Sequence, residues 1–259
     1  MSAGTLRRSQ ATAACLVTAV WRTGRVAGCD AEQRLALQQA WLQRLGQALE
    51  IETIVSGDPP PVRALWVANH VSWLDVVALG RQRALLFVAK RELSRWPLIG
   101  RLARTSGTRF IDRDGQRGLR GLVEELAGQL HGGRSVALFP EGTTTRGDQL
   151  LRFRPLLFQA AVLAGVAVQP VALRYRERGP RQVAPYLGDD LFVSHLSRVL
   201  RAPPRAVELH FLPRLPAQGQ PAHHLARASA RLIAEALDLP GLPPARELNS
   251  LALGWGHAG

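Results

Sequence analysis

From residue 63 onward, short apolar segments alternate with longer segments that have helical spacing. The expected strands span 63–68, 84–89, 108–111, 135–139, 166–173 and 206–211. The expected helices span 73–79, 92–104, 116–130, 155–164 and 221–237. Continuous apolar strands separated by helices are typical of a mostly parallel sheet covered on both faces. The chain is therefore expected to have an α/β fold, with its site beyond the carboxyl ends of the strands.

The first 56 residues have a different pattern, which predicts two amphipathic helices. The break between them is Gly28-Cys29-Asp30, where Asp30 can cap the second helix. This hairpin could pack on the main domain or lie in one membrane leaflet, with Trp21 and Trp41 at the headgroup level. We favour the membrane, because cations flank the apolar first helix closely. The expected domains are the hairpin at 1–56, a catalytic domain at 57–240 that opens with a proline-rich connector, and a tail at 241–259.

Charge and cysteine usage restrict the function classes. The 33 basic and 20 acidic residues give a formal net charge of +13, which attracts anionic membranes, acidic proteins or nucleic acid. No apolar run reaches the length of about 20 residues that a transmembrane helix needs. Cys15 and Cys29 fit neither a disulfide framework nor a metal site, so we expect a reducing compartment and no bound metal.

The strongest chemical signal follows the first strand of the alternating region. His70 and Asp75 are separated by four residues, at a point where a strand should turn into a helix. The carboxylate can then fold back onto one imidazole nitrogen, which fixes the tautomer and makes the other nitrogen a better base. Without further support, such a pair is more often a capped turn.

Three further blocks lie at the ends of other expected strands. Glu141-Gly142-Thr143 offers a carboxylate, a flexible backbone and a hydroxyl, although a polar turn without a ligand would look similar. The block 107–113 ends in Arg113, which could bind two phosphate oxygens or simply pair with a neighbouring aspartate. The block 168–173 contains a proline that indicates an edge or a bulge near the site.

Taken together, these blocks resemble the glycerophospholipid acyltransferase family, which includes 1-acyl-glycerol-3-phosphate acyltransferase. Family members share the four motifs that this sequence carries in the same order: Asn69-His70 with Asp75, Gly107 to Arg113, Phe139 to Thr143, and Val168 to Leu173. The resemblance runs from about residue 66 to 173. It implies the fold of that family, with a two-helix element that docks on the bilayer.

The resemblance also implies a reaction and a set of roles. His70, oriented by Asp75, would deprotonate the acceptor hydroxyl, which attacks the thioester of acyl carrier protein or coenzyme A without an acyl-enzyme. Asn69, Arg113, Glu141, Gly142 and Thr143 would bind the acceptor, and no cofactor beyond the thioester co-substrate is expected. The expected acceptor is 1-acyl-glycerol-3-phosphate, the product is phosphatidic acid, and the expected location is the cytoplasmic face of the inner membrane.

One departure from the family pattern leaves the acceptor open. Thr144 and Thr145 precede Arg146, where many members have arginine and then serine. Relatives with the threonine-rich version include acyltransferases of ornithine lipid synthesis, so O-acylation of lyso-ornithine lipid is the alternative. Arg113 would then bind the ornithine carboxylate. A third hypothesis is a non-catalytic basic module that binds membranes or nucleic acid, although no nucleic-acid motif supports it.

Overall fold

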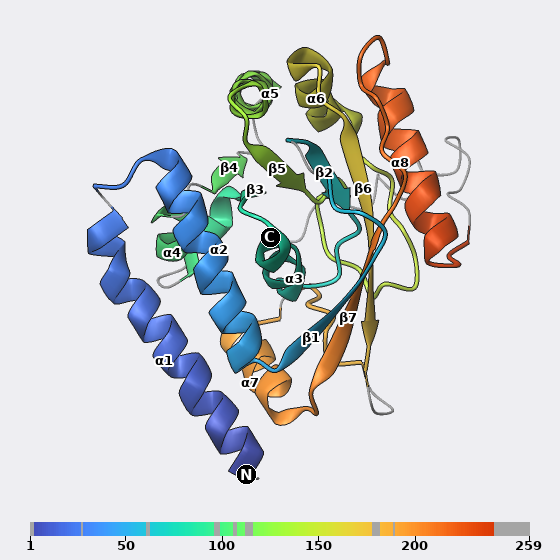
Figure 1. Cartoon of the computed structure of the whole chain (residues 1–259). Helices are drawn as coiled ribbons and strands as arrows, with labels where there is room; N and C mark the ends of the chain where they lie inside the picture. Colours follow the sequence, from blue (N-terminus) through green and yellow to red (C-terminus); the bar gives the residue numbers. More distant parts are fainter. Residues whose placement is uncertain are drawn as a thin grey trace, which may run out of the picture.

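The computed structural model describes residues 3–26, 28–60, 63–95, 99–105, 108–111, 116–177, 182–188 and 190–240. A seven-stranded sheet runs through the molecule in the order β1-β7-β6-β2-β5-β3-β4 (Figure 1). Five of the strand pairings are parallel, and the β6–β7 pairing is antiparallel. The strands are β1 (Ile51–Ser56), β2 (Leu65–Ala68), β3 (Leu85–Lys90), β4 (Arg109–Ile111), β5 (Ser135–Leu138), β6 (Val168–Arg176) and β7 (Arg205–Phe211).

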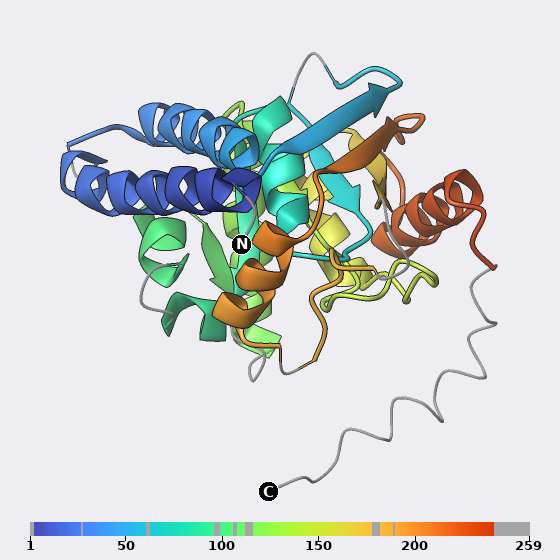
Figure 2. The ribbon, with the colours of Figure 1, turned by 90° about the horizontal axis from the view of Figure 1, so that it is seen from below.

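Helices cover both faces of this sheet, as the alternating pattern predicted. They are α1 (Ala3–Val26), α2 (Ala31–Ala48), α3 (Leu74–Gln82), α4 (Ile99–Thr105), α5 (Gln116–His131), α6 (Gln159–Ala164), α7 (Phe192–Arg201) and α8 (Ala222–Ala236), with short 3₁₀ turns at Arg91–Arg95 and Pro155–Phe158. The view from below separates α1, α2 and α7 from α8 on the other side of the sheet (Figure 2). The expected α/β fold with a mostly parallel sheet is therefore confirmed.

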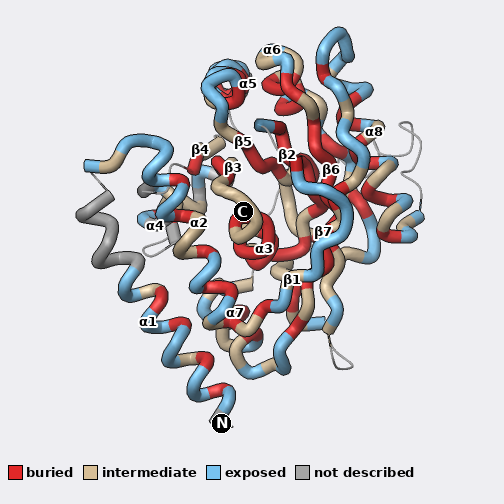
Figure 3. The backbone as a smooth tube through the Cα atoms, in the orientation of Figure 1, coloured by how far each residue is buried: buried red, intermediate tan, exposed pale blue. Residues whose placement is uncertain are grey.

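Burial explains why the central strands form where they do. Every residue of β2 and of β5 is buried, so these strands have apolar neighbours on both faces (Figure 3). One core cluster, which includes Leu126, Phe158 and Ile233, packs under α5, α6 and α8. A second cluster, which includes Trp66 and Leu79, packs under α2, α3 and α7. The carboxyl end of β2 is thereby held rigidly between two packed layers.

Several expected boundaries were wrong. Residues 51–56 were assigned to the hairpin, but they form the edge strand β1, which pairs in parallel with β7. The sheet therefore includes residues from the expected N-terminal domain. The segment 180–204 was expected to be irregular, yet it contains α7, and β6 runs to Arg176, three residues beyond its expected end. The expected helix at 92–104 is a 3₁₀ turn followed by α4, with residues 96–98 outside the described part.

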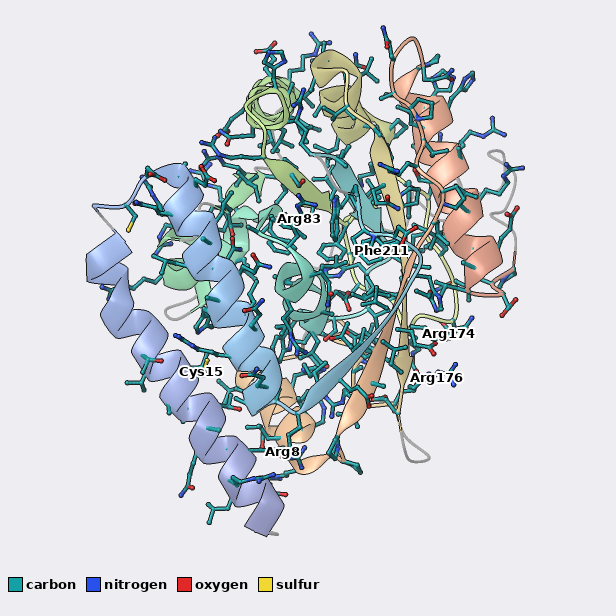
Figure 4. All side chains as sticks on the ribbon, viewed as in Figure 1. Arg8, Cys15, Arg83, Arg174, Arg176 and Phe211 are labelled. Carbon is teal, nitrogen blue, oxygen red and sulfur yellow. The ribbon has the colours of Figure 1, made fainter. Side chains whose placement is uncertain are left out.

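The two N-terminal helices are present, and Asp30 caps the second as expected by accepting hydrogen bonds from the N–H groups of Glu32 and Gln33. The first helix has an unusual orientation. Among the side chains of this helix that the structure describes, Thr5, Arg8, Thr12 and Cys15 are buried, whereas Leu6 and Val17 are 51% and 55% exposed. Figure 4 shows Arg8 and Cys15 on the side of α1 that faces the rest of the molecule. Within the described ranges, no helix combines the length and the apolar character needed to cross a bilayer.

Candidate active site

The site begins where β2 ends at Ala68. His70 lies in the short loop that follows, and Asp75 lies in the first turn of α3. Because the chain turns from strand to helix here, the carboxylate folds back toward the ring. The imidazole Nδ1 lies 2.8 Å from Asp75 Oδ2. The pairing expected from the four-residue spacing is therefore present.

The Asp75 carboxylate is held by a dense set of donors. Its side chain has no exposed surface, and its Oδ2 also accepts hydrogen bonds from the backbone N–H groups of Val71 (2.7 Å) and Ser72 (2.9 Å). Its Oδ1 accepts a hydrogen bond from the Tyr175 hydroxyl. Several donors on a buried carboxylate favour its ionised form. An ionised Asp75 accepts a hydrogen bond from the protonated Nδ1 of His70, which leaves Nε2 as the basic nitrogen of the ring.

The His70 ring is more accessible than its partner, with 19% of the side chain exposed. Phe139, at the end of β5, stacks on the ring at a centroid distance of 4.0 Å and an interplanar angle of 14°. The backbone N–H of His70 donates to Glu141 Oε1 at 2.7 Å. The ring is thus fixed by its Nδ1, by one face and by its own backbone, which suits a group that must hold one orientation.

Glu141 is a buried carboxylate that accepts hydrogen bonds from the backbone of two separate segments. Oε1 accepts the His70 N–H, and Oε2 accepts the N–H of Leu151 at 2.9 Å. Burial raises the pKa of Glu141 to about 7, an effect that these two hydrogen bonds oppose and the nearby charge of Asp75 reinforces. Both oxygens are engaged by the protein, so Glu141 helps to position His70 in this structure.

The turn that follows β5 is joined to the His70 loop by a second set of bonds. Gly142 has a φ of +73°, a left-handed conformation that glycine adopts readily, and its N–H donates to Phe139 O. Thr145 N–H donates to the carbonyl oxygen of His70 at 2.8 Å. The guanidinium of Arg154 lies beside Gly142, with Nε 3.1 Å from the position that a Cβ would occupy there. The positive charge of Arg154 therefore lies at this turn.

The remaining residues of the expected site lie in different surroundings. Asn69 is buried, and its amide bonds the backbone N–H and carbonyl of Leu173, so it links the end of β2 to β6. Thr143 is partly exposed in the turn after Glu141. Arg113, together with residues 107 and 112, lies outside the described residues. Its expected contact with an acidic group of the acceptor stays a prediction.

Two residues near the motif escaped the sequence analysis. Tyr175 binds Asp75 from β6, and His195 in α7 accepts a hydrogen bond at Nδ1 from Trp73 Nε1 (3.0 Å). The Nε2–H of His195 donates to Pro185 O at 3.1 Å. Burial lowers the pKa of His195, which favours the neutral ring that these two bonds require. The alternation of Leu173 and Tyr175 with two arginines was the available signal for Tyr175, whereas no sequence signal pointed to His195.

The comparisons with known proteins agree with this geometry. A family model described as acyltransferase matches residues 53–174, which include the His70 loop, the Glu141 turn and most of β6. A lyso-ornithine lipid O-acyltransferase of Pseudomonas aeruginosa is 46% identical over 82% of this chain and 83% of its own length. The chain belongs to the acyltransferase family.

Two other relatives of the acyltransferase carry a different name. A 1-acyl-sn-glycerol-3-phosphate acyltransferase of Neisseria gonorrhoeae is 35% identical over 69% of each chain. The crystal structure of the 1-acyl-sn-glycerophosphate acyltransferase PlsC from Thermotoga maritima matches with a TM-score of 0.62 and 20% identity, over 98% of this chain and 96% of that one. The structural match bears on the fold, which the two proteins share across nearly their whole lengths.

Proposed function

We propose that this acyltransferase moves a fatty acyl chain from a thioester donor directly to the free hydroxyl of a lysolipid, with His70 as the general base. The observation that carries the proposal is the 2.8 Å hydrogen bond between His70 Nδ1 and the fully buried Asp75. Nε2 accepts the hydroxyl proton while the oxygen attacks the thioester carbonyl, and the resulting imidazolium is stabilised by Asp75. The proton then passes to the departing thiolate, so no covalent acyl-enzyme forms.

The two blocks around His70 have separate roles in this mechanism. Glu141 holds the His70 backbone through its carboxylate, and Thr145 holds the His70 carbonyl. Gly142 and Thr143 form a turn that is partly exposed, and this turn contacts the acceptor. Arg154 beside Gly142, and Arg113, supply positive charge for an acidic group on the acceptor.

Lyso-ornithine lipid is the acceptor that we favour. The support is the Pseudomonas aeruginosa lyso-ornithine lipid O-acyltransferase, which is more similar to this chain than the Neisseria gonorrhoeae relative is, over a larger share of both proteins. The Thr144-Thr145 departure from the common family pattern agrees with this choice. The arginines of the site would bind the ornithine carboxylate.

Lysophosphatidic acid, which the sequence analysis placed first, is the second candidate. The observation in its favour is the Neisseria gonorrhoeae relative, a 1-acyl-sn-glycerol-3-phosphate acyltransferase that matches over two thirds of the chain. A phosphate monoester carries up to two negative charges and binds arginine in two places at once. Both acceptors thus use the same cations, and the chemistry at His70 is unchanged.

Charge and the exposed residues of α1 support the proposed donor and the proposed location. Acyl carrier protein and coenzyme A are both acidic, which suits a chain of net charge +13. The outward-facing Leu6 and Val17 of α1, together with its inward-facing Thr5, Arg8 and Thr12, support attachment to the cytoplasmic face of the inner membrane. A lysolipid would then reach His70 without leaving the leaflet.

The test compares both acceptors with purified protein. Acyl transfer from acyl carrier protein or coenzyme A thioesters is measured with lyso-ornithine lipid and with lysophosphatidic acid in mixed micelles, for the wild type and His70→Ala. We expect a kcat/KM at least about tenfold higher for lyso-ornithine lipid, and a loss of at least about a hundredfold in His70→Ala. A preference for lysophosphatidic acid would select the second candidate. Full activity without His70 would end the proposed mechanism.

A further inference from the structure

The two oxygens of the Asp75 carboxylate have very different surroundings. Oδ2 accepts hydrogen bonds from the His70 ring and from the N–H groups of Val71 and Ser72, all within the same short loop. Oδ1 accepts its bond from Tyr175, which lies 100 residues further along the chain. Among the described residues, Tyr175 provides the one hydrogen bond to Asp75 from outside the motif. The rotation of the carboxylate about its last bond is therefore tied to β6.

The position of Tyr175 is set by strand register. β2 and β6 pair from Leu65 with Val168 to Ala68 with Val171, where β2 ends. β6 continues to Arg176, so its last five residues run beside the His70 loop without a β2 partner. Asn69 bonds both backbone groups of Leu173 in this overhang. Because side chains alternate along a strand, Tyr175 lies on the same face as Leu173, beside the motif.

The two arginines that flank Tyr175 point away from the motif and pair elsewhere, whereas Tyr175 faces inward. Arg174 pairs with Asp238 at 3.4 Å, and Arg176 pairs with Glu208. Both arginines are labelled near the free end of β6 in Figure 4. Tyr175 itself packs against the core cluster under α2, α3 and α7. The strand register thus places the phenol ring of Tyr175 beside the Asp75 carboxylate.

The charges around Tyr175 keep its hydroxyl protonated. Burial, with Asp75 next to it, raises the pKa of Tyr175 well above its ordinary value, and the opposing charge of Arg205 does not reverse this. Arg205 is itself buried and lies 3.6 Å from Glu177, which offsets its charge. On the other side of the motif, Glu141 lies close enough to Asp75 for the charge of Asp75 to raise the pKa of Glu141 further. The hydroxyl therefore stays protonated at neutral pH and donates to Asp75.

We propose that Tyr175 is a positioning residue for the transfer reaction, and that it acts through Asp75. Its hydroxyl holds the carboxylate so that Oδ2 faces the His70 ring, and it keeps Asp75 ionised as the acceptor of the Nδ1–H bond of His70. Tyr175 does not touch the substrate in this role. The kinetic part of the proposal rests on the proposed function, whereas the link to Asp75 is a property of the free protein.

The test removes the hydroxyl and keeps the ring, in Tyr175→Phe. Loss of a hydrogen bond to a charged group predicts a fall in kcat of about tenfold or more, with KM changed less than about twofold. The His70–Asp75 pair also takes up a proton more readily once a donor to the carboxylate is gone. The acid limb of the pH–rate profile should therefore move to higher pH by about half a unit or more.

Two controls separate positioning from packing. Ser229→Ala removes another buried hydroxyl, on α8, and should change neither kcat nor the acid limb. In an Asp75→Asn background, Tyr175→Phe should have an effect of less than about twofold, because the charge through which it acts is absent. Equal effects of Tyr175→Phe in both backgrounds would overturn the proposal, as would an unmoved acid limb.

A measurement without substrate makes the result independent of the acceptor. The ring signals of His70 are followed by NMR as a function of pH, in the wild type and in Tyr175→Phe at a temperature where both are folded. We expect the titration midpoint to rise in the variant by about half a pH unit or more. An unchanged midpoint would refute the role of Tyr175. A wild type that acylates neither acceptor would refute the proposed function and leave this titration as the deciding result.

Discussion

Replacing Asp75 with asparagine tests the mechanism most directly, because the structure predicts that the fold survives while the charge is lost. The carboxylate has three donors on Oδ2 and the Tyr175 hydroxyl on Oδ1. An asparagine can place its oxygen at the Oδ2 position and keep those three bonds. Its amide group then faces Tyr175, whose oxygen can accept a hydrogen bond. The substitution therefore keeps hydrogen-bonding partners for both the oxygen and the nitrogen of the new side chain.

The expected loss comes from the charge alone. When His70 takes the acceptor proton, an imidazolium forms with its Nδ1 at 2.8 Å from Asp75 Oδ2, and the charge centres are roughly 4 Å apart. At an effective dielectric constant of about 20, two unit charges at this separation attract by about 4 kcal/mol. Because about 1.4 kcal/mol corresponds to a factor of ten in rate, we expect kcat to fall by about a hundredfold to a thousandfold.

The assay measures kcat for the wild type, Asp75→Asn and Asp58→Asn with the acceptor that the wild type prefers. Asp58 is an exposed aspartate in the connector after β1, so its substitution makes the same chemical change without a site contact. The thermal midpoints of the three proteins should agree within a few degrees. A fall in kcat of less than about fivefold in a folded Asp75→Asn variant would refute the role of Asp75 in stabilising the imidazolium.

The remaining predictions concern the groups that support His70. The pKa of Glu141 is raised from an ordinary 4.5 to about 7, so the folded state binds a proton over a pH interval in which the unfolded state does not. From pH 5 to pH 8, the free energy of unfolding of the wild type should therefore fall by about 2 to 3 kcal/mol relative to Glu141→Gln, as measured by urea denaturation; a pH-independent difference would contradict this. Asn69→Ala should lower the free energy of unfolding by about 2 to 4 kcal/mol, because it leaves two buried backbone groups of Leu173 unpaired; a change below about 0.5 kcal/mol would show that the clamp is not needed. Gly142→Ala and Gly133→Ala should each lower the free energy of unfolding by about 1 kcal/mol, because alanine is strained in the left-handed conformation of these glycines. Only Gly142→Ala should also reduce kcat, because its Cβ would meet Arg154.

The sequence was sufficient for the parts of the fold in which one strand is buried on both faces. β2, β3 and β5 were predicted within one or two residues, because a short continuous apolar run between turn residues is too short for most helices and fits a buried strand. The edge strand β1 was missed for the opposite reason. It exposes Ile54 and Val55, and its mixture of polar and apolar residues follows a helical segment without a strong break.

The pairing of His70 with Asp75 was predictable because its geometry is local. Asp75 comes five positions after His70, so a strand-to-helix turn is enough to join them. Tyr175 could not be placed in the same way, since its contact depends on the register of β6 against β2. Glu141 was expected to bind the acceptor, which stays a prediction, but the backbone hydrogen bonds that both of its oxygens accept could not be predicted from the sequence. Long-range register and the pairing of backbone groups are properties of the tertiary structure.

The hydrogen bonds between the two motif blocks have a consequence for acceptor choice. Glu141 accepts the N–H of His70, and Thr145 donates to the carbonyl oxygen of the same residue, so the proposed base is held through its own backbone by groups of the protein. Thr143 and the Arg154 guanidinium lie at the turn surface, outside these bonds to His70. Side chains at the surface can therefore change without moving the base. Such a separation accounts for relatives that share this scaffold while their names record two different acceptors, lyso-ornithine lipid and 1-acyl-sn-glycerol-3-phosphate.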